Sequence, residues 1–155
     1  MRLSSPTRTR DNRAVSAKAQ SDNVRLLARM YEAWDAQDRA GVLDLLDPDF
    51  EWVNPSYAVH PGIRRGHEGM TRVMENLDES FERQKRVLGE VEELGDERVL
   101  WHTVFQARGR DSGAQIEIEE QHLWTLRAGK IVRIQWFHDA AEARRAAGLQ
   151  RSVIT

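Results

Sequence analysis

The chain has 155 residues, of which 40% are hydrophobic and 31% charged, with 10 glycines and 4 prolines. This length and composition fit one folded domain and exclude a collagen-like or low-complexity chain. Cysteine is absent, which excludes disulfide bonds, thiolate metal sites and a cysteine nucleophile. No apolar run approaches the roughly 20 residues that span a bilayer, and the N-terminal sequence lacks the apolar stretch of a signal peptide. We therefore expect a cytoplasmic protein that does not bind membranes.

The formal net charge of −2 is unevenly distributed along the chain. Residues 1–20 hold four arginines and one lysine against one aspartate, a net charge of +4, so the remaining residues carry −6. These cations are not interleaved with aromatic residues and form no nucleic-acid-binding motif. We predict a disordered basic extension over 1–20, a folded domain over 21–148, a C-terminal tail over 149–155, and no nucleic-acid partner.

Three helices and one strand are predicted in the first half of the chain. Ser21 is placed to cap a helix with apolar residues at three- and four-residue spacing, and Asp38 is placed to cap a short helix that ends before Pro48. Residues 50–54 alternate as in a strand, and a loop is expected to follow. Gly66 precedes a third helix. Its apolar stripe is Met70, Val73, Met74, Leu77 and Phe81.

Four strands and a last helix are predicted in the second half, where the hydrophobic period changes to two. Short turns separate the strands, so we expect an antiparallel meander. Asp139 and Gly148 are placed to cap the C-terminal helix at its two ends. The predicted strands are 86–93, 98–108, 114–126 and 130–138. This order of elements predicts an α+β fold with helices on one face of a curved sheet.

Two ionisable residues, Glu120 and His122, lie on the side of strand 114–126 that carries its apolar residues. A three-residue turn at 127–129 would pair Leu126 with Lys130. That register places His122 opposite Ile134 and Glu120 opposite Trp136. His138 is then a diagonal neighbour of Glu120, within side-chain reach.

A carboxylate buried beside two imidazoles favours acid–base chemistry. Burial raises the pKa of a carboxyl group and nearby imidazoles oppose that shift, so the coupled groups are expected to titrate near neutral pH. General acid–base catalysis needs such groups. The alternative is a His–Glu pair that only satisfies its own hydrogen bonds inside the fold.

All five tryptophans fall on predicted inward faces. Helical spacing or strand parity gives this placement for Trp34, Trp52, Trp101, Trp124 and Trp136. Large aromatic residues at such spacing usually pack in a core. An interior this rich in indole rings leaves room only for a small or flat ligand.

Five segments together resemble the nuclear transport factor 2-like superfamily, and in particular its SnoaL-like and ketosteroid-isomerase-like branch, over residues 21–148. They are LLARMYEAWDAQD, FEWVNP, RRGHEG, RGRDSG and LWTLRAGKIVRIQWFHDAAEARRAAGL. The resemblance implies a cone, in which a curved antiparallel sheet wraps around three helices from the N-terminal half and a short helix ends the chain. It also implies one pocket at the open end and a homodimer through the convex face of the sheet.

The resemblance carries over to individual positions unevenly. Steroid isomerases of this superfamily use an aspartate base, a helix tyrosine and a protonated acid, and the corresponding positions here hold Asn54, Met30 and His122. Limonene epoxide hydrolases share the aromatic and asparagine pair seen at Trp52 and Asn54, but Trp101, Thr103 and Trp136 replace their other residues. SnoaL-type polyketide cyclases use an acid–base residue on the concave sheet, a role that His122, Glu120 or His138 can fill.

We therefore expect a small-molecule isomerase, cyclase or lyase that acts without a cofactor on an apolar or carbonyl-bearing substrate. His122 would transfer the proton, Glu120 and His138 would tune or relay it, and Asn54 would orient an oxygen. Further residues expected at the ligand are Met30, Tyr31, Trp34, Trp52, Tyr57, His60, Trp101, Thr103, Phe105, Ile118, Trp124, Ile134 and Trp136. The alternatives are a non-catalytic binding module and a metal site of two histidines and one carboxylate.

Overall fold

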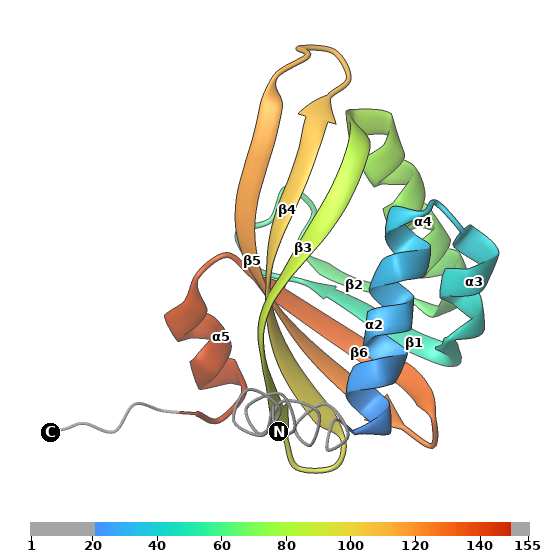
Figure 1. The fold of residues 1–155 in the computed structure, drawn as a ribbon, viewed down its shortest axis with the longest axis vertical. Coiled ribbons are helices and arrows are strands. Elements are labelled where there is room, and N and C mark those ends of the chain that lie inside the picture. The colour runs from blue at the N-terminus through green and yellow to red at the C-terminus, as the bar shows by residue number, and fades with distance from the viewer. Residues whose placement is uncertain (1–20, 150–155) are drawn as a thin grey trace, which may run out of the picture.

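The computed structural model describes residues 21–149, so the predicted extension at 1–20 and nearly all of the predicted tail at 149–155 lie outside the described residues. The described part is an α+β fold with a curved six-stranded sheet (Figure 1). The predicted fold class is confirmed. Its elements in chain order are α2 (Asp22–Asp35), α3 (Arg39–Asp44), β1 (Leu46–Asn54), β2 (Gly62–Arg65), α4 (Gly66–Ser80), β3 (Phe81–Leu94), β4 (Arg98–Gly109), β5 (Gln115–Arg127), β6 (Lys130–Phe137) and α5 (Ala140–Ala146).

The predicted helix caps are confirmed. The side chains of Ser21, Asp38 and Asp139 each accept a hydrogen bond from a backbone N–H in the first turn of α2, α3 and α5. Gly148 follows α5 with a φ of 81° and donates to the carbonyl of Arg145, as in a Schellman motif. Within residues 21–149, no helix is both long and apolar enough to cross a membrane.

The first half differs from the prediction in several places, and β1 begins at Leu46 instead of at residue 50. Helix α4 ends at Ser80, so Phe81 opens β3 instead of extending the helical stripe. The segment expected to be a loop contains β2, which pairs antiparallel with β1. This strand has only four residues and no alternation of buried and exposed side chains, so hydrophobic periodicity could not reveal it.

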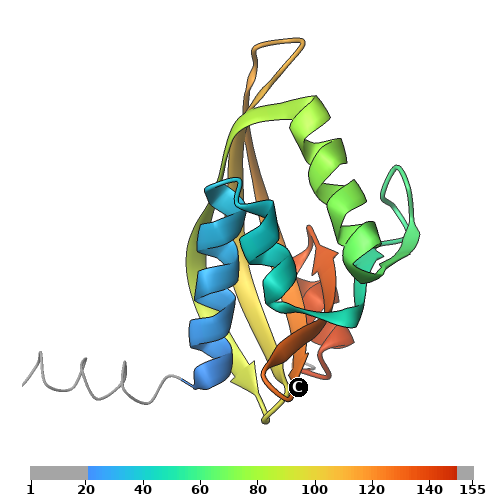
Figure 2. The same ribbon diagram turned by 90° about the vertical axis from the view of Figure 1, so that its right-hand side faces the viewer.

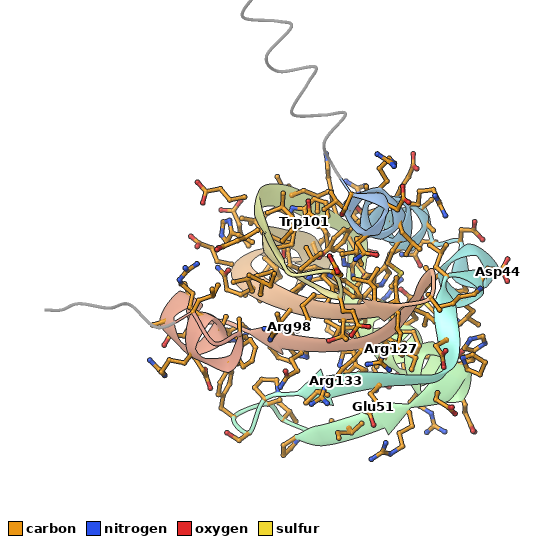
Figure 3. The ribbon with its side chains drawn as sticks, turned by 90° about the horizontal axis from the view of Figure 1, so that it is seen from below. Asp44, Glu51, Arg98, Trp101, Arg127 and Arg133 are labelled. Carbon is orange, nitrogen blue, oxygen red and sulfur yellow. The ribbon has the colours of Figure 1, made fainter. Side chains whose placement is uncertain are left out.

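The strand order is β2-β1-β6-β5-β4-β3. The predicted antiparallel meander of β3 to β6 is confirmed, and the sheet is mainly antiparallel, with β1 and β6 paired in parallel. On the outer face, Glu51 of β1 holds Arg133 of β6 at 3.5 Å and Arg65 of β2 at 2.5 Å, which joins these three strands (Figure 3). Helices α2, α3 and α4 lie together on one face of the sheet (Figure 2).

The turn between β5 and β6 has two residues, so the predicted three-residue turn is wrong. Ala128 and Gly129 both have positive φ, 54° and 77°, as a type I′ turn requires. Arg127 therefore pairs with Lys130, and a bulge at Val132 shifts the register again. His122 lies opposite Trp136 and not opposite Ile134. The total shift is two residues, which preserves the predicted inward face.

The core has two parts, one on each side of the sheet. The larger part fills the space between the concave face and helices α2 to α4, and includes Trp34, Trp52, Trp101 and Trp124. The smaller part lies under α5 on the opposite face, where Leu100, Leu123 and Phe137 contact the helix's alanines. Leu123 has the predicted outward parity but is buried, because α5 covers it.

Candidate functional site

A cavity of about 440 Å³ lies between the concave face of the sheet, α4 and the loop after β1. Its walls are mainly apolar and aromatic, and a few polar side chains reach it, as in typical small-molecule sites. Ten of the predicted site residues line it. They are Trp34, Trp52, Phe105, Ile118 and Trp136 on the apolar walls, and Asn54, Tyr57, His60, Glu120 and His138 among the polar groups.

The other predicted site residues pack in the core and do not line this cavity. All are buried. They are Met30, Tyr31, Trp101, Thr103, His122, Trp124 and Ile134. His122 and Glu120 are both on the inner face of β5, but Glu120 lines the cavity and His122 does not.

Glu120 is held by a chain of hydrogen bonds that begins in the core. Its Oε1 accepts from Nε2 of His122 at 2.9 Å. The other ring nitrogen, Nδ1, lies 2.7 Å from the Tyr31 hydroxyl. That hydroxyl accepts in turn from the indole N–H of Trp124 at 2.8 Å. The chain joins helix α2 to strand β5 through buried side chains.

The hydrogen bonds around His122 direct an N–H toward Glu120. An indole N–H only donates, so the Tyr31 hydroxyl accepts from Trp124. The same hydroxyl lies against Nδ1 of His122, while Nε2 faces Oε1 of Glu120, which as a carboxylate can only accept. Nε2 therefore carries the proton that points to Glu120.

The surroundings of Glu120 lower its pKa. Burial raises the pKa of Glu120, but the hydrogen bond from His122 and the nearby His122, Arg86 and His138 outweigh it, so the pKa falls below its ordinary value of 4.5. Burial raises the pKa of Tyr31 well above 10.0. Glu120 is thus a carboxylate and Tyr31 a neutral phenol at neutral pH.

The lowered pKa of Glu120 predicts a specific loss of stability in acid. A carboxyl group whose pKa is lower in the folded than in the unfolded chain stabilises the fold above the unfolded value, here 4.5, and this contribution disappears as the pH falls through the folded value. Glu120→Gln should therefore flatten the dependence of the free energy of unfolding on pH below about 4.5. Urea unfolding between pH 3 and 6 measures this pH dependence, and Glu119→Gln, on the outer face of the same strand, is the control. Equal curves for both variants would contradict the assignment.

Asn54 connects two indole rings to the loop after β1. Its Oδ1 accepts from the indole N–H of Trp52 at 2.7 Å and of Trp136 at 2.8 Å. Its Nδ2 donates to the carbonyl of His60 at 2.9 Å. This oxygen already serves two strong donors, so the amide orients the aromatic wall and the loop.

The mouth of the cavity carries the remaining predicted polar residues. Tyr57 and His138 are in ring contact at 5.7 Å, and the backbone N–H of His138 donates to the Tyr57 hydroxyl at 2.9 Å. Burial is the first cause that raises the pKa of Tyr57, and the nearby carboxylates of Glu142 and Asp139 raise it further. His60 and His138 are exposed, so both groups meet solvent at the entrance.

Thr103 has a buried hydroxyl without a hydrogen-bond partner among residues 21–149. It lies opposite Glu120 in the pairing of β4 with β5. A buried polar group without a partner costs free energy, so Thr103→Val should raise the free energy of unfolding by about 1 kcal/mol. Urea unfolding tests this. A loss of stability would mean that the hydroxyl has a partner such as a buried water.

The sequence did not reveal Arg86, which lines the cavity from β3 with a side chain that is only 3% exposed. Strand parity gives no warning of it, because the apolar residues Val87, Leu88 and Val91 of this strand fall on both parities. Arg64, Asn76 and Phe81 also line the cavity and were not predicted to do so.

The geometry does not support the alternative of a metal site. Within the described part of the chain, no three His, Asp or Glu side chains lie close enough together to hold a metal ion. His122 uses both ring nitrogens in hydrogen bonds inside the protein.

The family assignment follows from a comparison with protein-family models. A model described as a SnoaL-like domain matches residues 27–134, which is more than half of the chain. The chain belongs to the SnoaL-like family. The resemblance seen in the sequence is thereby confirmed, and the fold of this SnoaL-like protein agrees with it.

Several solved structures share this fold. An NTF2-like protein of unknown function from Burkholderia pseudomallei shares 25% identity at a TM-score of 0.69, over 81% of this chain and 97% of the other. TerC, co-crystallised with polyporic acid, shares 23% at 0.68, over 83% and 99%. A protein described as a SnoaL-like polyketide cyclase, from Jannaschia sp. CCS1, shares 21% at 0.67, over 84% and 94%.

No curated protein matches the sequence closely enough to add an activity. The fold is also that of a hypothetical protein from Catenulispora acidiphila described as having a ketosteroid isomerase-like fold, which shares 15% identity at a TM-score of 0.65. The expectations of a homodimer through the convex face and of a cytoplasmic location stay predictions.

Proposed function

We propose that this SnoaL-like protein binds a small, flat, largely apolar molecule in its cavity and moves a proton on it, as an isomerase, cyclase or lyase, with Glu120 as the base. The observation that carries the proposal is the position of this carboxylate. Glu120 lines the cavity with a side chain that is 21% exposed, and within the described residues the hydrogen bond to His122 engages only its Oε1. The second oxygen is left for the ligand.

The roles of the two inward residues are therefore exchanged relative to the sequence-based expectation. His122 does not line the cavity, so we assign it a positioning role in which its Nε2–H orients the carboxylate and stabilises its charge. Asn54 holds the aromatic wall instead of contacting the reacting oxygen. His138, at the mouth, is placed to exchange protons with solvent.

The chemistry of the base limits the substrate. A carboxylate with a lowered pKa is a modest base, so the C–H bond that it breaks must be acidic, as it is next to a carbonyl group. Glu120 takes the proton, and the electron pair moves into an enolate. Return of the proton to another carbon gives an isomer. Attack of the enolate carbon on a second carbonyl carbon of the same molecule opens that C=O π bond and closes a ring. Loss of a leaving group from the neighbouring carbon, with the enolate's electron pair forming a double bond, gives the product of a lyase.

The aromatic walls and two structural neighbours support a flat ligand. Trp34 and Trp52 meet edge to face at 5.7 Å, and Trp136 and Phe105 complete the apolar lining. TerC was crystallised with polyporic acid, and another neighbour is described as a polyketide cyclase. Polyporic acid is therefore a rational first probe of binding to this chain.

The proposed reaction is tested with 2-tetralone, a flat bicyclic ketone with acidic C–H groups. In deuterated buffer, the protein should accelerate exchange of the protons next to the carbonyl, followed by NMR. Glu120→Gln should slow the catalysed exchange by about 10²- to 10⁴-fold. Glu119→Gln is the matched control, because Glu119 is the adjacent residue on the outer face of β5 and pairs with His102. Exchange that is equal in both variants would overturn the role of Glu120.

The second candidate is a binding protein without catalysis. The lowered pKa of Glu120 favours a binding protein, because a carboxylate that stays charged is a good acceptor for a hydrogen-bond donor of the ligand. Titration with polyporic acid, followed by tryptophan fluorescence, measures binding through the indoles that line the cavity. Saturable quenching together with no acceleration of exchange would support this candidate over the enzyme.

A further inference from the structure

Arg86 is a buried cation that forms part of the cavity wall, and the proposed reaction has not yet used it. Its Nη1 donates to Oδ1 of Asp35 at 3.0 Å, and its Nη2 donates to Oε1 of Gln84 at 3.1 Å. Both carboxylate oxygens of Asp35 also accept the backbone N–H of Arg86, at 3.1 and 3.2 Å. The guanidinium is therefore fixed in position before any ligand binds.

Two aromatic rings flank the guanidinium. Its central carbon is 3.8 Å from the ring centre of Trp34 and 5.2 Å from that of Phe105. Among the described residues, its two side-chain bonds use two of the five N–H groups that a guanidinium carries. The remaining N–H groups are available to a molecule in the cavity.

The sheet register places Arg86 across the cavity from Glu120. Arg86 pairs with Phe105, and Phe105 with Ile118, which is two residues before Glu120 on β5. Two strand spacings and two residues along a strand separate their backbones by roughly 12 Å. Both side chains line the same cavity on the concave face. Within the described residues, Arg86 forms its ion pair with Asp35 and Glu120 with His122, so each has further polar atoms to offer a ligand in the cavity.

We propose that Arg86 binds the carbonyl oxygen of the substrate and stabilises the negative charge that forms there when Glu120 removes the neighbouring proton. The C–H bond breaks, its proton goes to Glu120, and its electron pair forms a carbon–carbon double bond. The π electrons of the carbonyl move to oxygen, next to the guanidinium. Reprotonation reverses these movements, so the step needs no external reactant. Stabilisation of such an oxyanion is a major contribution to enzyme catalysis.

This inference rests on the proposed function and narrows the substrate class to flat ketones and related carbonyl compounds. Other polar groups at the cavity are less suited to the role. The oxygen of Asn54 already accepts two indole N–H groups, and His60 and His138 are exposed at the mouth. Arg86 combines burial, fixed geometry and positive charge.

The probe for this interaction is 4-nitrophenol, whose phenolate resembles an enolate in charge and shape and absorbs visible light. Glu120→Gln serves as the background, because the neutral amide resembles the protonated base. In this background, replacing the pair by Asp35→Asn and Arg86→Met should weaken phenolate binding by about 10- to 100-fold. The uncharged 4-nitroanisole should bind equally to both proteins.

Removing the two partners together leaves no buried charge without its counterion, so this variant is the safer one to fold. Circular dichroism checks its fold. If it does not fold, Arg86→Lys in the same background carries the test, since it keeps the charge but not the planar fork, and should weaken phenolate binding several-fold. Unchanged phenolate binding in a folded variant would overturn the proposal.

The results also separate this inference from the proposed function. Unchanged phenolate binding in the Arg86 variants, with tetralone exchange still lost in Glu120→Gln, overturns the role of Arg86 alone. Arg86-dependent phenolate binding, with exchange that does not depend on Glu120, overturns the role of the base while Arg86 remains an anion-binding residue.

Discussion

Tyr31→Phe should lower the free energy of unfolding by about 2–4 kcal/mol, because it leaves two buried groups without partners, each of which costs about 1–3 kcal/mol. These groups are the indole N–H of Trp124 and Nδ1 of His122, which the Tyr31 hydroxyl joins. The ring itself stays in place, packed edge to face against Trp101 at 5.4 Å. Urea unfolding followed by circular dichroism measures the loss.

Tyr57→Phe is the matched control, since these are the two tyrosines of the chain. Tyr57 is 48% exposed and its hydroxyl accepts one backbone N–H, from His138, which water can replace. Its loss should cost no more than about 1 kcal/mol. Equal losses in the two variants would contradict the view that the Tyr31 hydroxyl is a buried junction.

Arg86→Met should lower the free energy of unfolding by about 2–4 kcal/mol, because it removes the partner of a partly buried carboxylate. The Asp35 side chain is 25% exposed, so water screens part of the cost. Adding Asp35→Asn should restore part of the stability, since the neutral amide no longer needs a counterion. A double-mutant cycle measured by urea unfolding gives the coupling energy between the two residues.

A surface ion pair provides the comparison. Arg144 of α5 and Glu92 of β3 are 3.0 Å apart with both side chains nearly half exposed. Glu92→Gln should change the free energy of unfolding by less than about 1 kcal/mol. A double variant of Asp35 and Arg86 that is no more stable than Arg86→Met alone would contradict the importance of the uncompensated carboxylate.

Local signals predicted most of the fold. The caps at Ser21, Asp38 and Asp139 act through side chains a few residues away, so the sequence near each helix contains the information. The parallel pairing of β1 with β6 brings together residues about 80 apart in the chain, as Trp52 and Ile134 are, and no local pattern specifies it. The register of β6 was wrong by two residues, one because the turn has two residues instead of three and one because of the bulge at Val132.

The alternation of inward and outward residues along each strand predicted part of the candidate site. It placed Glu120 and His122 on the inner face of β5, because the apolar residues of that strand share their parity. The same reasoning fails in β3, where Arg86 is buried while Val87 and Val91 are each 38% exposed. The burial of Arg86 depends on Asp35, which α2 supplies from 51 residues earlier. Such a partner is visible only in three dimensions.

Helix α2 supports both halves of the proposed proton-transfer site. Tyr31 contacts His122 behind the base, and Asp35 holds Arg86. These two helix residues are four positions apart, which is about one turn, or close to 6 Å along the axis. The sheet register separates the base from the cation, and one turn of α2 supplies the contact behind each of them. A substitution that shifts or rotates α2 would therefore disturb both groups together, although neither is on the helix.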